Sequence, residues 1–491
     1  MNGMMYSSTR LSQHAVGTPF RNSFARQNRR RVHGAVRGRR GGSTVTSSLQ
    51  YEIDGGVVRV KPAKDRECVT VLSIDGGGVR GLIPAVVLLS VEKEIIRQIK
   101  GKEIQIDMAD FFDCISGTSV GCIVALYLAS KGGSDSCNEE IRRLGIRPGS
   151  VEGIVKLIEK NSEIIFPSPW YSWIPFFGDL LGYAKLFFQP KFASDGVEKS
   201  LKDVFGEMTL KDVKTASVVP TFELSGNRAF SFWTHDGDTG YAALKPRSSP
   251  RASSVRKQAK PLRSIQFGED GLMDWDPDVR HVGGHNYKLW QVARASTAAP
   301  TFFPAPTFAP VEGSKDSATF VDGGVVANNP TMQSIVFMEY NKKCSLKDIA
   351  VLSLGTGHAQ PDTAKLNNAG AFGWVVQGGA LMSILMDGSS EFLQSLVDIS
   401  YYQTLKTQLA QYVRISVCVD QEHKDEQVLS EMDNPKNLTR LREIGNELGV
   451  EYKRPIKEFV EDFLLEIEAD ECHSLGEEAS GKEKEQVNAG I

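Results

Sequence analysis

Two short segments of this chain combine the residue types that acyl-transfer chemistry needs. Asp75–Gly81 (DGGGVRG) offers a run of backbone N–H groups without side chains, and Gly117–Gly121 (GTSVG) offers a serine between glycines. A serine hydroxyl can attack an ester carbonyl, and nearby N–H groups can stabilise the oxyanion that forms. Together the two segments predict a hydrolase that acts on esters.

The first segment is expected to form a turn from a strand into a helix. Val69–Ile74 is a short apolar, β-branched run typical of a buried strand, and Leu82–Ile99 has helical apolar spacing with Pro84 in its first turn. Glycines keep the backbone between these elements free of side chains and allow positive φ. The groups expected to face the oxyanion are the N–H groups of Gly76, Gly77 and Gly78, with Arg80 as a nearby positive charge.

The second segment is expected to repeat this strand, turn and helix around Ser119. Phe111–Ile115 is interpreted as a strand and Cys122–Ala129 as an apolar helix. Gly117 and Gly121 flank the serine, so a tight elbow can form without a clash and the helix N-terminus points at the hydroxyl. Ser119 is therefore the predicted nucleophile.

The glycine loop has a rival interpretation as a dinucleotide-binding fingerprint. Gly76, Gly78 and Gly81 satisfy GxGxxG between a strand and a helix. That fold also needs an acidic residue at the end of the next strand, roughly 20 residues further on, to hold the ribose. Here Glu92 and Glu94 stand at that distance, inside the predicted helix. The fingerprint fails at this point, which favours the hydrolase.

A candidate base for Ser119 lies in the second half of the sequence. Ala318–Val321 (ATFV) is expected to be a strand that runs directly into Asp322, Gly323 and Gly324. A carboxylate at the carboxyl end of a strand is presented to a site built on strand ends. Asp-Gly is also a common turn pair, so a turn-capping role is the alternative on local sequence alone.

In this order the motifs resemble those of the patatin-like phospholipases. DGGGVRG is similar to the family's oxyanion loop, GTSVG to its nucleophile elbow, and the aspartate of DGG at 322–324 to its catalytic aspartate. The resemblance covers about residues 66–450 and includes Ala293–Ala305 (ARASTAAPTFFPA), Ala327–Pro330 (ANNP) and Ser353–Gly357 (SLGTG). It implies an α/β protein, with a three-layer α/β/α fold around a central, mostly parallel sheet.

The resemblance also implies a function and its residues. Ser119 and Asp322 would form a catalytic dyad without a histidine, and the backbone of Gly76, Gly77 and Gly78 would form the oxyanion hole. The implied activity is hydrolysis of fatty-acyl esters of membrane glycerolipids, phospholipids or galactolipids, with no cofactor and no metal. A catalytically idle lipid-binding or scaffold protein is the alternative, because fold does not fix function.

The base can act in a dyad or in a triad. An unperturbed aspartate has a pKa near ~3.9 and is a weak base for a hydroxyl. In a dyad most of the rate must come from the oxyanion hole, where losing one donor typically costs about 10²–10³ in rate. Ser119, Asp322 and His358 also follow the order of an α/β-hydrolase triad, which is the alternative.

The composition indicates one sizeable enzyme domain with appendages. The chain has 491 residues, a net charge of −3 and seven scattered cysteines without a CxxC pair, which favours neither a disulfide framework nor a zinc site. Because the motifs extend from residue 75 to residue 357, one interleaved core of about 350–380 residues is expected. The expected divisions are a basic tail at 1–50, a catalytic domain at 66–450 and a polar acidic tail at 468–491.

Two basic segments suggest where the protein acts. Residues 1–50 hold nine arginines and no lysine or acidic residue, which fits a transit peptide or a disordered basic tail able to contact anionic lipid or nucleic acid. Residues 245–263 hold seven basic residues and no acidic one, and are interpreted as a solvated insertion. The expected location is intracellular, in the cytoplasm or peripherally on a membrane, or in a plastid if the tail is a transit peptide. No specific nucleic-acid partner is expected.

An aromatic stretch lies between the elbow and the basic insertion. Phe166–Phe188 holds nine aromatic residues interrupted by prolines and glycines, so it cannot form a continuous membrane-spanning helix. A lid or lipid-docking surface and simple packing over the core are both compatible with this stretch.

Overall fold

The computed structural model describes residues 50–54, 57–61, 68–99, 104–167, 189–244, 279–313, 315–370, 374, 380–405 and 411–465. Three of the predicted segments lie outside these residues: the basic tail at 1–50 except for its last residue, the basic insertion at 245–263 and the acidic tail at 468–491. The aromatic stretch also lies outside them, except for its first two residues. The divisions predicted for them remain predictions. None of the helices in the described ranges has the length and apolar character needed to cross a membrane.

A parallel sheet of four strands forms the centre of the molecule. Its strands are β3 (Val69–Ile74), β5 (Cys114–Gly117), β12 (Ile349–Leu354) and β14 (Tyr412–Ile415), in the spatial order β14-β12-β3-β5. These strands are short and apolar, and β5 and β12 are buried throughout because helices cover both faces. Alternate side chains therefore enter two separate cores, one on each face.

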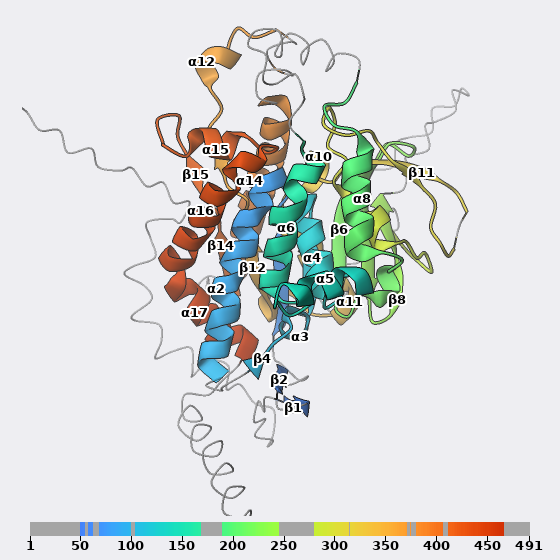
Figure 1. The fold of residues 1–491 in the computed structure, drawn as a ribbon, viewed down its shortest axis with the longest axis vertical. Coiled ribbons are helices and arrows are strands. Elements are labelled where there is room, and N and C mark those ends of the chain that lie inside the picture. Colours follow the sequence, from blue (N-terminus) through green and yellow to red (C-terminus); the bar gives the residue numbers. More distant parts are fainter. Residues whose placement is uncertain are drawn as a thin grey trace, which may run out of the picture.

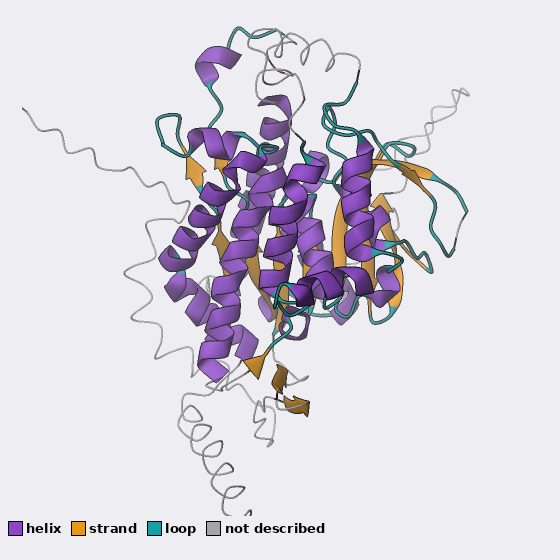
Figure 2. Ribbon diagram, in the orientation of Figure 1, coloured by secondary structure: helices purple, strands orange, loops and turns teal. Residues whose placement is uncertain are grey.

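Helices cover both faces of this sheet. Figures 1 and 2 show the helices of one face in front of the strands. They pack on Leu72 and Ile74 of β3, whereas Val71 of the same strand contacts the helices behind. The front helices are α2 (Leu82–Ile99), α4 (Val120–Ala129), α6 (Val151–Ile165) and α16 (Leu438–Glu451), and those behind are α11 (Thr331–Lys342) and α14 (Ala380–Leu405).

An antiparallel sheet continues from the edge of the parallel one. Ile115 of β5 donates its N–H to the carbonyl of Ala216, immediately before the first antiparallel strand. The strands are β6 (Ser217–Glu223), β7 (Arg228–His235), β8 (Asp238–Leu244), β9 (Val279–Gly283), β10 (Thr307–Phe308) and β11 (Ala318–Asp322), in the order β10-β11-β6-β7-β8-β9.

Shorter elements surround the two sheets. β1 (Gln50–Asp54), β2 (Val57–Lys61) and β4 (Ile104–Gln105) form a small sheet, and β13 (His358–Ala359) pairs with β15 (Cys418–Val419). The remaining α-helices of the described ranges are α3 (Met108–Phe111), α5 (Asp135–Arg143), α8 (Ser194–Phe205), α9 (Leu289–Ser296), α10 (Gly324–Ala327), α12 (Thr363–Leu366), α15 (Glu426–Ser430) and α17 (Lys453–Phe459).

The predicted fold class, an α/β/α arrangement around a central parallel sheet, is confirmed. β3 and α2 have the predicted bounds, but the strand expected at Phe111–Ile115 is wrong at its start. Phe111 is the last residue of helix α3, and strand β5 begins at Cys114. Between them, the carboxylate of Asp113 accepts hydrogen bonds from the N–H and the hydroxyl of Thr70 at 2.9 and 3.0 Å. Two buried phenylalanines thus resemble the start of a strand in sequence, while Phe111 is the last residue of a helix and Phe112 is an extended residue that precedes the strand.

Candidate active site

Ser119 stands on a sharp elbow between β5 and α4. Its φ of 53° and ψ of −127° are unusual for a residue with a side chain. The elbow can be this tight because its flanks carry no side chain: a Cβ on Gly117 would overlap the backbone of Gly121. A Cβ on Gly121 would in turn meet the carbonyl oxygens of Ile74 and Asp75 at 2.5 Å. Neither position could therefore carry a side chain without a shift of this backbone.

The elbow is held from the antiparallel half of the fold. The N–H of Ser119 donates to Oγ of Ser296 at 3.0 Å, and that hydroxyl donates to the carbonyl of Pro220 at 2.7 Å. Thr118 donates its hydroxyl to the carbonyl of Ala327 at 2.8 Å. Ser296 lies within Ala293–Ala305, one of the segments that resemble the family, but no local pattern predicted its contact with Ser119.

Asp322 ends β11 and meets Ser119 at the boundary between the two sheets. Oγ of Ser119 donates to Oδ2 of Asp322 at 2.8 Å, and the N–H of Gly324 donates to Oδ1 at 2.7 Å. The backbone N–H of Asp322 donates to the carbonyl of Ala298 at 3.0 Å, and the N–H of Gly323 donates to the carbonyl of Ser296 at 3.4 Å. Residues 203 positions apart are thus brought into direct contact.

The pKa of Asp322 differs from that of the unperturbed aspartate considered in the sequence analysis. Its side chain is fully buried. Burial raises the pKa of Asp322 to about 7, although the hydrogen bonds from Gly324 and Ser119 oppose that rise by favouring the carboxylate. A carboxylate with a pKa near neutrality is a much better base for a hydroxyl than an unperturbed aspartate, since general bases are most effective when their pKa is near the operating pH.

The glycine loop lies against the elbow, but only part of it can bind an oxyanion. The N–H of Gly76 donates to the carbonyl of Asn328 at 3.1 Å, so this donor, expected to be available, is already engaged. Within the described residues, no acceptor is in hydrogen-bonding range of the N–H groups of Gly77 and Gly78. Gly78 has a φ of 58°, a conformation that favours glycine, and it lines the pocket beside Ser119.

Arg80 does not supply a charge to the pocket. Its side chain is fully buried, and Nη1 donates to the carbonyl of Leu429 at 2.7 Å while Nη2 lies 3.8 Å from Oδ1 of Asp387. Burial lowers the pKa of Arg80, and the carboxylate of Asp387 opposes this. The prediction that Arg80 places a positive charge at the site is therefore wrong. Arg80 instead lies beneath the glycine loop and connects it to Asp387 on α14 and to Leu429 near the end of α15.

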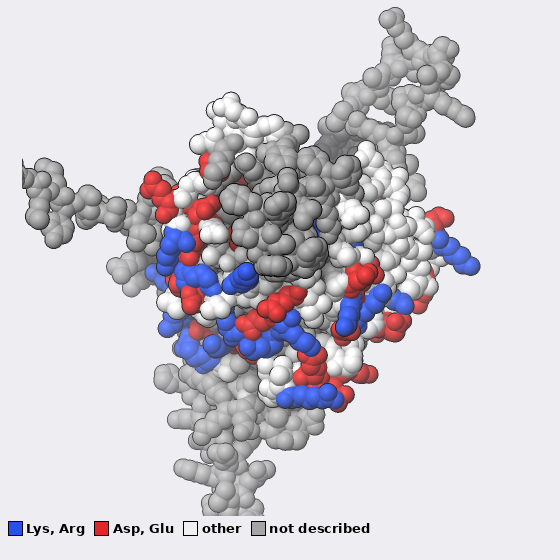
Figure 3. Space-filling model, turned by 45° about the horizontal axis from the view of Figure 1, so that its top comes forward, with Lys and Arg blue, Asp and Glu red and all other residues white. Residues whose placement is uncertain are grey.

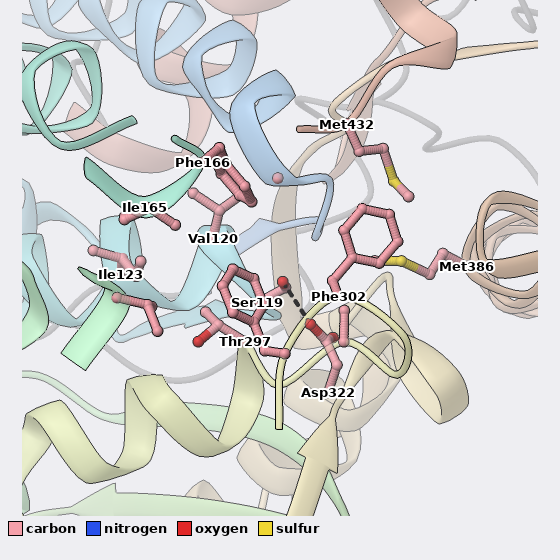
Figure 4. A pocket seen from close by; sticks show the side chains of 14 residues that line it. Ser119, Val120, Ile123, Ile165, Phe166, Thr297, Phe302, Asp322, Met386 and Met432 are labelled. Atoms are coloured by element: carbon pink, nitrogen blue, oxygen red, sulfur yellow. Dashed lines mark hydrogen bonds between the residues drawn. The ribbon is translucent and has the colours of Figure 1, made fainter. Parts of the chain in front are cut away.

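An apolar pocket opens above Ser119 and Asp322, as Figure 4 shows. Its walls come from eight separate parts of the chain, and the only ionisable group among its lining residues is Asp322. Apolar walls with a few polar groups at one point are typical of a site that binds an apolar ligand in a fixed orientation. The side chains labelled in Figure 4 that form these walls include Ile123, Ile165, Phe166, Phe302, Met386 and Met432.

The other candidates from the sequence lie away from the pocket. His358 is on β13, where its backbone N–H donates to the carbonyl of Val417, and it is not among the groups that shift the pKa of Asp322. Glu92 and Glu94 are inside α2, so neither can hold a ribose at a strand end. In the described ranges, no three His, Cys, Asp or Glu side chains come close enough together to hold a metal ion.

The geometry joins the hydroxyl of Ser119 to a buried carboxylate at the base of an apolar pocket. A serine hydroxyl beside a base is the arrangement that acyl transfer through a covalent intermediate requires. A model of the family described as patatin-like phospholipase matches residues 72–335, from β3 to α11, which include both Ser119 and Asp322. The chain belongs to the patatin-like phospholipase family, whose general activity is lipid acyl hydrolysis.

Similar proteins agree with this assignment along most of the chain. Patatin-like protein 3 of Arabidopsis thaliana is 28% identical over 410 residues, which cover 79% of this chain and 82% of that protein. Patatin-like protein 2 of Oryza sativa subsp. indica is 28% identical and covers 67% of this chain and 71% of its own length. A protein of Arabidopsis thaliana named probable inactive patatin-like protein 9 is 26% identical, and the match covers 67% of this chain and 70% of that protein.

The raised pKa of Asp322 predicts the pH dependence of hydrolysis. Below about pH 7 the carboxyl group is protonated and cannot accept the hydroxyl proton of Ser119, so kcat/KM for a soluble ester should fall with one ionisation near pH 7. The measurement is kcat/KM from pH 5 to 9, with circular dichroism as the control for folding. Full activity retained at pH 5 in a folded enzyme would contradict the assignment of the base.

The position of His358 predicts a small effect of its removal. Because His358 contacts neither Ser119 nor Asp322, His358→Ala should change kcat by less than about tenfold, whereas a triad histidine would cost several orders of magnitude. Steady-state kinetics of this variant beside Ser119→Ala decide between the two. Equal losses in both would establish a triad.

Proposed function

We propose that this protein hydrolyses fatty-acyl esters of membrane glycerolipids through a dyad of Ser119 and Asp322. The observation that carries the proposal is the 2.8 Å hydrogen bond from Oγ of Ser119 to a fully buried carboxylate at the base of an apolar pocket. Nucleophile and base are thereby aligned, and the pocket supplies an environment for an acyl chain.

The first half of the proposed reaction forms an acyl-enzyme. Asp322 takes the proton of the Ser119 hydroxyl as Oγ attacks the ester carbonyl carbon. The N–H groups of Gly77 and Gly78 stabilise the oxyanion, because they are the donors of the loop without another acceptor in the described structure. The tetrahedral intermediate collapses, the ester C–O bond breaks, and the leaving alcohol takes the proton from Asp322.

The second half returns the enzyme to its starting state. Water attacks the acyl carbonyl, Asp322 takes a proton from that water, and the same loop stabilises the second oxyanion. When the bond from Oγ to the acyl group breaks, the fatty acid leaves and Ser119 regains its proton from Asp322. Every proton moves between Asp322, the serine, the leaving alcohol and water.

The apolar walls favour an acyl chain over a polar substrate. Burial of the apolar chain in the pocket supplies binding energy, roughly 0.8 kcal/mol for each buried CH₂ group. Since the lining carries no charged side chain other than Asp322, the pocket itself would select the acyl chain and leave the head group outside. Phospholipids and galactolipids are therefore both proposed as substrates.

A catalytically idle lipid-binding protein is the alternative, and one similar protein is named probable inactive. Three features of this chain favour catalysis over binding alone. Ser119 occupies a strained backbone conformation, and its hydroxyl is hydrogen-bonded to a carboxylate with a pKa raised to about 7. In the described part of the chain, the N–H groups of Gly77 and Gly78 in the neighbouring loop make no hydrogen bond. A binding protein has no need of this combination.

Membrane attraction is proposed to come from the two basic segments, 1–50 and 245–263. On the described surface in Figure 3, basic and acidic side chains alternate, so this face has no patch of one sign. Elsewhere among the described residues, charged side chains are joined in ion pairs, including Lys156 with Glu159, Lys160 with Glu140, and Arg442 with Glu159. Peripheral contact with anionic lipid would then depend on the segments that carry unbalanced positive charge.

The dyad predicts the outcome of three variants. Ser119→Ala and Asp322→Asn should each remove most esterase activity, and the double variant should be little worse than either, because members of one catalytic unit are not additive. The measurement is hydrolysis of a chromogenic acyl ester, followed by product analysis on mixed phospholipid and galactolipid vesicles. Near wild-type turnover by a folded Asp322→Asn enzyme would end the dyad proposal.

The basic insertion predicts a separable effect on membranes. Each Lys or Arg near an anionic surface contributes about 1 kcal/mol, screened by salt, so deletion of 245–263 should lower co-sedimentation with anionic vesicles at low salt. Hydrolysis of a soluble ester should not change, and neutral vesicles are the control. If the deletion variant and the full chain sediment equally with anionic vesicles, the insertion plays no part in recruitment.

A further inference from the structure

A buried ion pair lies directly behind the glycine loop. Asp75 is the residue before Gly76, and its two carboxylate oxygens accept from Nη1 and Nη2 of Arg414 at 2.8 and 2.5 Å. The Asp75 side chain is 3% exposed and that of Arg414 is 16% exposed. Two parallel charged hydrogen bonds of this kind fix both distance and orientation.

Arg414 reaches Asp75 across one strand of the sheet. Arg414 on β14 is paired in register with Ser353 on β12, and Ser353 with Ser73 on β3. The guanidinium donates to Oγ of Ser353 at 2.9 Å on its way to Asp75. The ion pair therefore connects the two strands that flank β12 at their carboxyl ends, where the glycine loop begins.

Asp75 is held by three elements at once. Its N–H donates to the carbonyl of Leu354 at the end of β12 at 2.9 Å, and Ser390 on α14 donates its hydroxyl to Oδ2 at 2.9 Å. Arg414 supplies the third contact from β14. Because Gly76 follows directly, a rotation of Asp75 would move the backbone of Gly77 and Gly78 with it.

The charges of this pair are expensive to bury, and the pair is a weak argument for stability alone. Burial by itself would lower the pKa of Arg414, but the carboxylate of Asp75 outweighs this effect and raises it, so the guanidinium stays charged. A guanidinium that is always charged and offers a fixed fork of donors suits the task of holding a carboxylate in one orientation.

We propose that Arg414 is a positioning residue for the oxyanion loop. Through Asp75 it sets the direction of the Gly77 and Gly78 N–H groups toward the acyl carbonyl bound at Ser119. Arg414 lies beyond residues 72–335, the segment that the family model covers, and nothing in its local sequence (YVRIS) signals this role. The inference rests on the proposed function, because it concerns the oxyanion of that reaction.

The test compares Arg414→Lys with a matched control. Lysine keeps the charge but cannot bind both carboxylate oxygens in parallel, so the loop should lose its fixed orientation. Since small misplacements of catalytic groups cost up to about 10²-fold, kcat for an ester should fall about 10- to 100-fold with little change in KM. The control is Arg440→Lys, which breaks a similar two-bond pair with Asp425, at 2.8 and 2.8 Å, elsewhere in the fold. It should change kcat by less than about threefold.

A second substrate separates positioning from general damage. In a thionoester, sulfur replaces the carbonyl oxygen and accepts hydrogen bonds poorly, so its hydrolysis depends less on the loop donors. Arg414→Lys should therefore lower the preference for the ester over the thionoester by about tenfold or more, whereas a merely structural defect lowers both rates equally. Titration of active Ser119 with a fluorophosphonate corrects all rates for misfolded protein.

Ser390→Ala keeps the inference testable if Arg414→Lys does not fold. It removes one hydrogen bond to Asp75, and should lower the same preference by about two- to fivefold. An unchanged preference in folded Arg414→Lys, or in Ser390→Ala if that variant alone folds, overturns the positioning role while the proposed function stands. Absence of any hydrolysis that depends on Ser119 in the unmodified protein overturns both.

Discussion

The buried carboxylate of Asp322 is the constraint on which the active site depends. A charge without solvent is costly, and among the described residues two hydrogen bonds, from Ser119 and Gly324, offset that cost. The apolar surroundings that we propose bind an acyl chain also raise the pKa of Asp322 to about 7, which suits it to act as a base at neutral pH. In the proposed reaction, substrate binding and activation of Ser119 therefore have one physical cause, the burial of the site in apolar side chains.

This arrangement requires two halves of the fold to stay in fixed register. Ser119 comes from the parallel sheet and Asp322 from the antiparallel sheet, and their contact of 2.8 Å survives only if the two sheets do not slide. Hydrogen bonds from Ser119 to Ser296 and from Thr118 to Ala327 cross the same boundary. On the other side of the elbow, Asp75 and Arg414 tie the glycine loop to the parallel sheet. Both sheets and the glycine loop are thus held in place around the hydroxyl of Ser119 and the carboxylate of Asp322.

Local patterns in the sequence predicted the elements and the two residues now in contact. Periodicity located β3 and α2, and glycines marked the elbow of Ser119 and the end of β11 at Asp322. Quantities that depend on tertiary surroundings could not be predicted: the pKa of Asp322, the engagement of the Gly76 N–H by Asn328, and the buried position of Arg80. Arg414 lies far from Asp75 in sequence, so a contact across the sheet left no local signal.

If Ser119 carries the acyl group during turnover, as we propose, this intermediate can be trapped. Enzyme mixed with a fatty-acyl ester and quenched in acid within one turnover can be digested and analysed by mass spectrometry. We expect the peptide with Ser119 to gain the mass of the acyl group, and the adduct to disappear as hydrolysis proceeds. An acyl group on another residue, or ester hydrolysis without any adduct under conditions that trap a known acyl-enzyme, would contradict the proposal.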